Sequence, residues 1–365
     1  MLQFNVFPLM YLTSQNVAFY LAGRGLIPFH SMVNDTLTVV EAPRRNRNFK
    51  VMRGTQPGFF VKQVASFEPL AMETHRRDGR CYWLANNHAE FTALLPLLPA
   101  FHTFDVAQSI LVTALLDGAE TLHQLHLQTG TFPTDVAVLL ANALAHFHVA
   151  FRGLPASAAS VAFPRMHPWA LTTGDPALFP SAMQTPTGRV FLDIMRARGV
   201  EQALTVERQR WRVETLVHGD LKWDNVLLTP VTASAAGALR IVDWEIADVG
   251  DPAWDIAAIF QAYLAHWLFS RTPGNESIPE SDVQFSAMQP AMRAFWSAYV
   301  IASGTINPAE LLDRSVAFAA ARLVQTAYES LYQAPSVTAH ALSFLDLAER
   351  LLTARTNAPR VILGH

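Results

Sequence analysis

Cysteine is almost absent from this sequence. Cys81 is the single cysteine among 365 residues. One thiol cannot form an intramolecular disulfide, and it cannot supply a zinc site made of several cysteines. We therefore expect a chain that folds without disulfides, as proteins of the reducing cytoplasm do.

Charged side chains are also scarce. Asp, Glu, Lys and Arg make up 16% of the residues, hydrophobic residues make up 51%, and the formal net charge is -3. Such a composition supports a large core and argues against a largely disordered chain. The weakly acidic balance also argues against a surface that binds nucleic acid.

Segments typical of secretion or membrane insertion are lacking too. The apolar start, MLQFNVFPLMYL, has neither the basic flank nor the small-residue cleavage site of a signal peptide. The longest apolar helical stretch, 136–151, is interrupted by Asn142, His146 and His148, and it is shorter than the roughly 20 residues that span a bilayer. We expect a soluble, cytoplasmic protein that does not associate with membranes.

Residues 216–260 are the most informative stretch of the chain. They read LVHGDLKWDNVLLTP, then a turn of small residues, then LRIVDWEIADVGDPAWDIAAIF. Two strand-like runs, 225–229 and 239–244, flank the turn and predict a hairpin. Acidic or amide side chains stand at the ends of both runs.

Three of these side chains, Asp220, Asn225 and Asp243, are expected at one rim of the hairpin. Mg²⁺ takes oxygen ligands and usually only one or two from protein. Asn225 and Asp243 can supply such oxygens, which leaves Asp220 to receive a proton from a hydroxyl group.

The motif spacing in this stretch matches that of a known superfamily. HGDLKWDN, residues 218–225, has the Asp-to-Asn spacing of the protein-kinase catalytic loop, and DWE, residues 243–245, stands where the metal-binding Asp of kinases follows. The His-Gly-Asp form and the later GDPAWD, residues 250–255, resemble the aminoglycoside phosphotransferase and choline kinase family of the protein kinase-like superfamily. The resemblance covers about residues 36–331.

Strand-like alternation lies mainly in the first third of the chain, and helical patterns dominate later. The early strand-like runs are 37–41, 49–53, 59–64, 103–108 and 109–116. Long helices are predicted at 135–152, 253–269, 284–303, 308–331 and 338–353. This order predicts an α+β fold.

The resemblance implies a two-lobed protein kinase-like fold. A small β-rich N-lobe, residues 1–116, would contain the nucleotide-binding sheet and one long helix. A large helical C-lobe, residues 117–365, would contain the catalytic loop and the acceptor site.

Lys62 lies inside an apolar strand-like run and needs a partner if it is buried. The resemblance implies that it binds the nucleotide phosphates and that a glutamate of the next long helix orients it. We assign Glu90, because it shares a helical face with Trp83 and Leu94. Glu73 is the alternative, and an outward-facing Lys62 is another.

The turn at 43–48 occupies the place of the glycine-rich loop of kinases. Neither GxGxxG nor a Walker A sequence occurs in the chain, so we assign nucleotide binding to Arg47 and Asn48, with guanidinium groups in place of a glycine cradle. A solvated basic turn is the alternative. By resemblance, backbone groups near Ala114 and Leu116 would receive the adenine edge.

In the C-lobe, the resemblance implies a role for each residue of the motif. Asp220 and Lys222 are catalytic, with Lys222 near the γ-phosphate. His218 and Asp255 support the loop. His123 and His126 are three residues apart on a predicted helix, but with no third ligand in register we interpret them as structural.

The sequence thus predicts a phosphotransferase that uses ATP and Mg²⁺ and moves the γ-phosphate to a hydroxyl of a small molecule or antibiotic. One alternative is a Ser/Thr kinase that acts on a peptide in lanthipeptide-like modification; another is a non-catalytic pseudokinase. Seven residues separate Asp243 from Asp251, so we expect no activation-loop phosphoswitch. The acceptor, ATP versus GTP, the oligomeric state and the role of the insertion 154–199 stay open.

Overall fold

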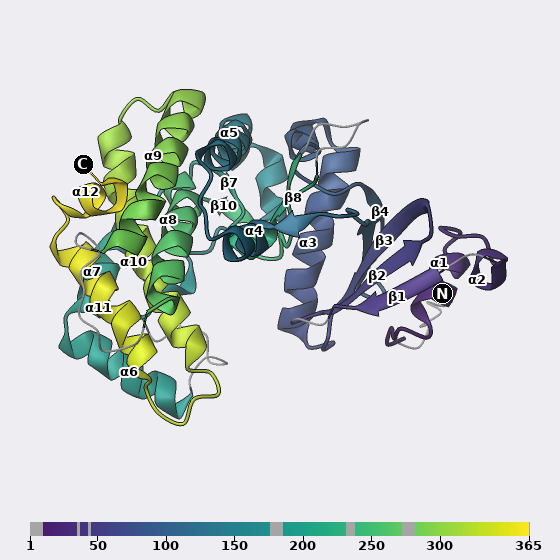
Figure 1. Cartoon of the computed structure of the whole chain (residues 1–365), viewed down its shortest axis with the longest axis horizontal. Helices are drawn as coiled ribbons and strands as arrows, with labels where there is room; N and C mark the ends of the chain where they lie inside the picture. Colours follow the sequence, from purple (N-terminus) through teal and green to yellow (C-terminus); the bar gives the residue numbers. More distant parts are fainter. Residues whose placement is uncertain are drawn as a thin grey trace. The chain divides into compact units, whose positions relative to one another are not determined.

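The computed structural model describes residues 10–34, 37–42, 45–175, 185–230, 238–271 and 282–364. The chain divides into two compact units, shown with their elements labelled in Figure 1. The first, the sheet unit, comprises Met1–Thr121 and Val226–Ile246, and the second, the helical unit, comprises Leu122–Asn225 and Ala247–His365. One unit is built on a sheet and the other on helices, which confirms the predicted two-lobed α+β fold.

The sheet unit is organised around one antiparallel sheet of five strands in the order β1-β2-β3-β5-β4. The strands are β1 Leu37–Glu41, β2 Arg47–Arg53, β3 Gln56–Gln63, β4 Phe101–Asp105 and β5 Ile110–Ala114. The sequence predicts all five strands: β1 has the predicted ends, and the ends of the other four are shifted. The β2–β3 turn lies at Gly54, whereas Gly58 lies within β3, where a Cβ atom would come within 2.7 Å of the Val51 carbonyl oxygen.

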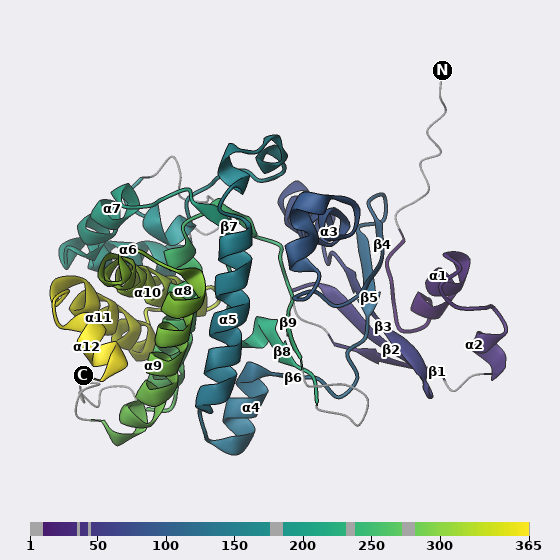
Figure 2. The same ribbon diagram turned by 90° about the horizontal axis from the view of Figure 1, so that it is seen from above.

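Strand alternation gives this sheet two different faces. Val51, Val61 and Val112 are buried in a hydrophobic cluster with residues of helix α1, Val17–Gly23. Lys62 follows Val61 in β3 and points to the other face, since successive side chains of a strand alternate. Helix α3, Pro69–Asn87, covers that face, and Figure 2 shows α1 and α3 on opposite sides of the sheet.

Three further short elements complete the described part of this unit around its sheet. Helix α2 spans Ser31–Asn34, and a 3₁₀ helix, η1, spans Ala89–Leu94. A small sheet in the order β6-β8-β9 combines Glu120–Thr121, Val226–Leu228 and Leu239–Ile241. The backbone N–H of Ile241 donates to the carbonyl of Leu97 at 2.7 Å, which ties the predicted hairpin to the sheet unit.

The helical unit is built around α8, Pro252–Phe269, which is buried along most of its length. Helix α10, Pro308–Ser330, packs on α8, and α5, Thr134–Ala150, packs on α9, Val283–Ser303. The remaining helices are α4 Leu122–Thr129, α6 Pro186–Ala197, α7 Val200–Gln209, α11 Ala339–Thr353 and α12 Ala358–Leu363. Strands β7 Thr215–Val217 and β10 Asp248–Gly250 form an antiparallel pair.

The described part of the predicted insertion 154–199 contains three short 3₁₀ helices and α6. The 3₁₀ helices are η2 Leu154–Ala156, η3 Ala158–Ala162 and η4 Trp169–Leu171. Part of this segment, residues 176–184, lies outside the described residues. Sequence periodicity did not predict α7, α12 or the β7–β10 pair.

One stretch, Thr134–Ala156, is long and apolar enough to cross a membrane by length and composition. It contains α5, whose residues Leu140, Leu144 and Phe147 are buried inside the helical unit. The packing of α5 on α9 is that of a core helix in a helical bundle.

Candidate active site

In the sheet unit, the candidate site centres on Lys62 of β3. Its side chain is 9% exposed, and its Nζ atom lies 2.7 Å from Oδ2 of Asp78 on α3. Nζ also donates a hydrogen bond to Asp243 and lies 3.9 Å from Oε2 of Glu245. One buried ammonium group thus has three carboxylates around it.

The pairing with Asp78 corrects the assignment of Glu90 as the partner of Lys62. Glu90 is exposed and lies in η1, after α3 has ended at Asn87. Helix α3 begins at Pro69, and proline is well suited to a first helical position. The alternative Glu73 therefore lies in the first half of α3, and Asp78 is on the buried face of this helix.

Electrostatics keep Lys62 charged. Burial by itself lowers the pKa of Lys62, but the nearby carboxylates outweigh it and raise the pKa above its ordinary value, with Asp78 the strongest of them and Asp243 next. Burial and the neighbouring Asp243 raise the pKa of Glu245. The lysine is thus a permanent cation in a setting with excess negative charge, which suits an additional cation or a polar ligand rather than an empty apolar core.

The position of Asp243 in this cluster depends on backbone geometry. Asp243 has a φ of 70°, a left-handed conformation that is uncommon outside glycine, asparagine and aspartate. The next N–H, that of Trp244, donates to Oδ1 of Asp78 at 3.1 Å. Asp78 therefore joins Lys62 to the turn that carries Asp243, and strain at this turn is typical of functional sites.

The arginine-rich turn contributes one contact to the cluster. Arg45 Nη1 donates to Glu245 Oε1 at 3.0 Å, so a basic residue of the predicted turn does lie at the site. Arg47 is in β2 and instead contacts the Leu12 carbonyl at 3.4 Å and the ring of Tyr11. Pro43 and Arg44 lie outside the described residues.

The other predicted nucleotide contacts lie along β2 and β5. Asn48 is paired with Lys62 across the β2–β3 ladder, which places it beside the charged cluster. Ala114 ends β5, with its N–H bonded to the carbonyl of Ala100, and Leu116 follows two residues later. Leu116 thus lies beyond the end of β5.

In the helical unit, strand β7 leads directly into the catalytic loop. Gly219 has a φ of 83°, which favours glycine because it has no Cβ atom. The N–H groups of His218 and Gly219 both donate to the carboxylate of Asp255, at 2.7 and 2.9 Å. Asp255 lies in the first turn of α8 and is fully buried, so the loop is held by the helix beneath it.

His148 of α5 completes this support, with Nε2 3.2 Å from Asp255 Oδ2. Burial by itself would raise the pKa of Asp255, but the hydrogen bonds from His148 and His218 hold it below its ordinary value. An ionised carboxylate makes stronger hydrogen bonds than a neutral one. The sequence predicted Asp255 and His218 in this role but not His148.

Asp220 is held from two sides. Lys222 Nζ lies 2.8 Å from Asp220 Oδ2, and Arg322 Nη2 lies 3.4 Å from Asp220 Oδ1. Arg322 is buried on α10 and also donates from Nη1 to the Gly219 carbonyl at 2.8 Å. No sequence signal pointed to Arg322, because α10 reads as a helix with an apolar face and the arginine is 102 residues from the loop.

Asn225 is fixed within the same loop. Its side-chain nitrogen donates to the Asp220 carbonyl at 2.8 Å, and its own N–H donates to the Lys222 carbonyl. With the nitrogen engaged, the side-chain oxygen is the atom suited to a cation. Within the sheet unit, Asp243 presents a half-buried carboxylate, 31% exposed.

His126 takes part in ring packing near this loop. Its ring lies 4.5 Å from that of Trp223 between centroids, and its Nδ1 atom contacts the Thr131 carbonyl at 2.8 Å. Burial lowers the pKa of His126 to about 4, so the ring is neutral at pH 7. The structural interpretation of this histidine fits these contacts.

Comparison with known proteins identifies the family. Residues 36–294 match the family model described as "Phosphotransferase enzyme family". The chain belongs to this family. The match contains every residue of the catalytic loop and of the Lys62 cluster.

Solved structures of this phosphotransferase type share the fold. Choline kinase LicA from Streptococcus pneumoniae is 15% identical, with a TM-score of 0.54 over 92% of this chain and 99% of that chain. The GDP complex of wild-type aminoglycoside 2'-phosphotransferase-IIIa is 13% identical, with a TM-score of 0.56 over 93% and 99%. Both support the protein kinase-like fold predicted from the HGD and GDPAWD motifs.

A relative in sequence covers a smaller region. Acyl-CoA dehydrogenase family member 10 from Mus musculus is 31% identical over 143 residues, which are 38% of this chain and 13% of that protein. The chain thus matches only a small part of that relative's length.

The kinase-like fold implies a metal ion, Mg²⁺, and the oxygen donors among the side chains can be compared with the ligands that this ion prefers. Among the described residues, no three His, Cys, Asp or Glu side chains group in a way that could hold a metal ion. Mg²⁺ needs fewer protein ligands, because it keeps waters and binds substrate phosphates. The Asn225 oxygen and the Asp243 carboxylate are each a hard oxygen donor, so each of these residues by itself fits Mg²⁺ that takes most of its ligands from water and a nucleotide.

Proposed function

We propose that this protein transfers the γ-phosphate of ATP to a hydroxyl group of a small molecule. The observation that carries the proposal is the environment of Asp220, whose carboxylate has one cation on each oxygen, Lys222 and Arg322. Asp255 holds the loop that presents it. Membership of a phosphotransferase family supports the reaction class.

Asp220 acts as the group that orients the acceptor hydroxyl and accepts its proton. Lys222 and Arg322 hold this carboxylate in position. As the hydroxyl oxygen attacks the γ-phosphorus, the bond from that phosphorus to the bridging oxygen breaks and ADP leaves. Such transfers depend mainly on alignment and charge stabilisation.

Lys62 binds the nucleotide phosphates. Asp78 holds its ammonium group in place at 2.7 Å, so the lysine needs little reorganisation when phosphates arrive. Asn48 and the backbone at Ala114 and Leu116 complete the proposed nucleotide contacts, whereas Arg47 is engaged with Leu12 and Tyr11. Asp78 takes the orienting role that the sequence had assigned to Glu90.

Mg²⁺ would be held by Asn225 and Asp243. When bound, it would neutralise phosphate charge together with Lys62. We propose that the enzyme is soluble and cytoplasmic and that neither nucleic acid nor membrane is its partner. ATP is the proposed donor, although the related aminoglycoside enzyme was solved with GDP.

A small acceptor is favoured over a peptide. The two structural relatives are named for choline and for aminoglycosides, both small hydroxyl compounds. The peptide alternative and the pseudokinase alternative have no specific contact in their favour. The pseudokinase would also be expected to lack one of the chemical groups, yet Lys62, Asp220 and Asp243 are all present.

The test is Asp220→Asn in the full chain, with Asp193→Asn as the matched control. Asp193 is on α6, and its side chain is 72% exposed. The sample is incubated with γ-labelled ATP, Mg²⁺ and a fractionated cell extract, and label is counted in small-molecule and peptide fractions. We expect the wild type and Asp193→Asn to label a small molecule.

Asp220→Asn should lose at least about a hundredfold in rate, as removal of a proton acceptor does, while it still binds ATP in calorimetry. Transfer that is unchanged in Asp220→Asn would disprove the mechanism. Label in the peptide fraction would establish the alternative acceptor, and Mg-dependent ATP binding without any transfer would support the pseudokinase.

A further inference from the structure

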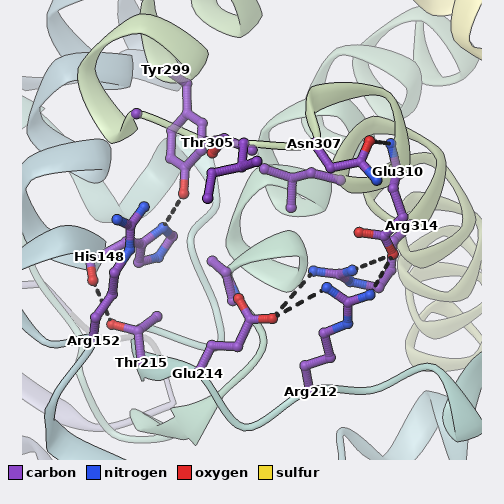
Figure 3. A pocket seen from close by; sticks show the side chains of 14 residues that line it. His148, Arg152, Arg212, Glu214, Thr215, Tyr299, Thr305, Asn307, Glu310 and Arg314 are labelled. Atoms are coloured by element: carbon purple, nitrogen blue, oxygen red, sulfur yellow. Dashed lines mark hydrogen bonds and ion pairs between the residues drawn. The ribbon is translucent and has the colours of Figure 1, made fainter.

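The helical unit contains a polar cavity that the proposed reaction does not use. Its volume is about 320 Å³, at the small end of the range of pockets that bind small molecules, about 300–1,000 Å³. Figure 3 shows His148 and Tyr299 on one side of it and Arg212, Glu310 and Arg314 on the other. Asp220, Lys222 and Asn225 do not line it.

Three arginines face this cavity, and they are not equivalent. Arg314 is 1% exposed, and its Nε atom lies 2.8 Å from Oδ2 of Asp251. Arg212 lies 3.1 Å from Glu310 and 3.5 Å from Glu214, between guanidinium nitrogens and carboxylate oxygens. These two arginines are paired, and they form one polar wall of the cavity.

Arg152 is the third, and it lies on the His148 side, away from the paired arginines (Figure 3). Its Nη2 atom donates to the Ser303 carbonyl at 2.7 Å. Among the residues that the structure describes, no carboxylate oxygen lies within 4.0 Å of the Arg152 nitrogens. Its guanidinium group therefore keeps donors that a ligand can use.

The helices around the cavity add to this positive character. Pro252 and Asn307, at the N-terminal ends of α8 and α10, both line it. Helix N-termini carry partial positive charge, and the forked guanidinium group matches the oxygens of phosphates and carboxylates. Glu214 and Glu310 offset part of this charge by binding Arg212, whereas Arg152 has no carboxylate partner in the part of the chain that the structure describes.

We propose that this cavity is a binding site for a small metabolite that carries a phosphate or carboxylate group, with Arg152 and Arg212 as its anion contacts. The acidic residues of the wall then contact the polar remainder of the ligand. None of Asp220, Lys222 and Asn225 lines the cavity, so it takes a ligand of its own rather than the nucleotide.

The walls of this cavity are joined to the catalytic loop by hydrogen bonds. His148 contacts Tyr299 Oη through Nδ1 at 2.8 Å and Asp255 through Nε2 at 3.2 Å. Asp255 in turn accepts from the N–H groups of His218 and Gly219. A ligand that orders His148 therefore also orders His218 and Gly219, which precede Asp220. Through this coupling the cavity regulates phosphate transfer. The regulatory role rests on the proposed function, whereas binding of the ligand does not.

Binding is tested on the full chain, without nucleotide or acceptor, by calorimetry with inorganic phosphate and with succinate at matched ionic strength. Arg152→Gln and Arg212→Gln are compared with Arg350→Gln, an exposed arginine of α11 that does not line the cavity. We expect binding to the wild type and to Arg350→Gln. Each cavity variant should bind about tenfold more weakly or less, the loss expected for a charge-assisted contact.

Inorganic phosphate and succinate distinguish a phosphate ligand from a carboxylate ligand. Binding of only one of them identifies which of these groups the cavity takes, and binding of neither overturns the proposal. Equal binding by Arg152→Gln, Arg212→Gln and Arg350→Gln also overturns it, because the anion then binds elsewhere. Thermal unfolding of each variant without ligand shows that it is folded.

Coupling is read from hydrogen exchange at the His218 and Gly219 amides, which the ligand should slow in the wild type and not in Arg152→Gln. If the ligand binds but the exchange of these amides is not slowed, the regulatory role is contradicted and the binding site is still supported. Because binding does not require catalysis, Asp220→Asn should bind the anion as the wild type does. An inactive protein that binds the anion thus contradicts the proposed function alone.

Discussion

Arg322 Nη1 donates to the Gly219 carbonyl at 2.8 Å, and its Nη2 atom lies 3.4 Å from the Asp220 carboxylate. The same guanidinium group lies over the ring of Trp254, 5.0 Å from its centroid, and Trp254 Nε1 donates to the same Gly219 carbonyl at 2.8 Å. Two side chains from different helices therefore hold one peptide group of the loop. The arginine fixes both the backbone and the carboxylate of the proposed catalytic residue.

Replacing Arg322 by Gln should lower kcat by at least about tenfold, the factor expected when a charge-assisted contact is lost, and should leave the KM for ATP within a factor of about two. Arg322→Lys should recover part of the rate, since it keeps the charge and loses the fork. Steady-state kinetics on both variants and on Arg350→Gln make the comparison. An increase in KM with unchanged kcat would assign Arg322 to substrate binding instead.

Asp78→Asn should destabilise the protein by about 3–5 kcal/mol, because it removes one member of a buried ion pair. It should also raise the KM for ATP, since Lys62 loses the carboxylate 2.7 Å away. Glu90→Gln is the control: Glu90 is exposed, so its effect on stability should stay within about 0.5 kcal/mol. Urea unfolding and ATP titration check both; a larger effect of Glu90→Gln would restore the original assignment.

Gly219→Ala should destabilise the loop by about 1–2 kcal/mol, because a Cβ atom strains the left-handed conformation. The backbone of Gly219, with its φ of 83°, positions the N–H that donates to Asp255. The activation free energy of phosphate transfer should therefore change by more than the free energy of unfolding. Gly153→Ala is the matched control, since its φ is −79° and no atom lies within 4 Å of the added Cβ. Comparison of rates and of urea midpoints shows whether the effect is specific to the loop.

Buried His75 should make the protein sensitive to acid. Burial, with the nearby charge of Lys62, lowers the pKa of His75 to about 4, below the unfolded value of about 6.5. Between these two values the unfolded chain binds the proton and the folded protein does not, so stability falls as pH falls through this window, by up to about 3 kcal/mol.

His75→Leu should therefore show a shallower loss of stability between pH 6.5 and 4 than the wild type. His126 has the same direction of shift, so part of the slope should remain. His146→Leu, at an exposed position, should keep the full wild-type slope. Urea unfolding at a series of pH values measures this, and equal slopes for all three proteins would contradict the expected role of His75.

Local pattern was sufficient for the motif and for much of the fold. Strand alternation and helix signals predicted β1 to β5 and the helices α5, α8, α9, α10 and α11 within a few residues, since these elements show clear periodicity of their own. Short elements such as β7 and β10, three residues each, have too little periodic signal. The spacing of Asp220, Asn225 and Asp243 is a property of sequence, and the family follows from it.

Partners across long distances in the sequence were decided by the tertiary structure alone. Lys62 pairs with Asp78 and not with Glu90 because of where α3 begins and ends. Arg322 contacts Asp220 only because α10 packs on α8. The cavity at Arg152 likewise brings together residues from the ends of several helices. Motifs and periodic elements could be predicted from the sequence, since they depend on local pattern. Side-chain pairing depends on packing between distant segments, which no local pattern encodes.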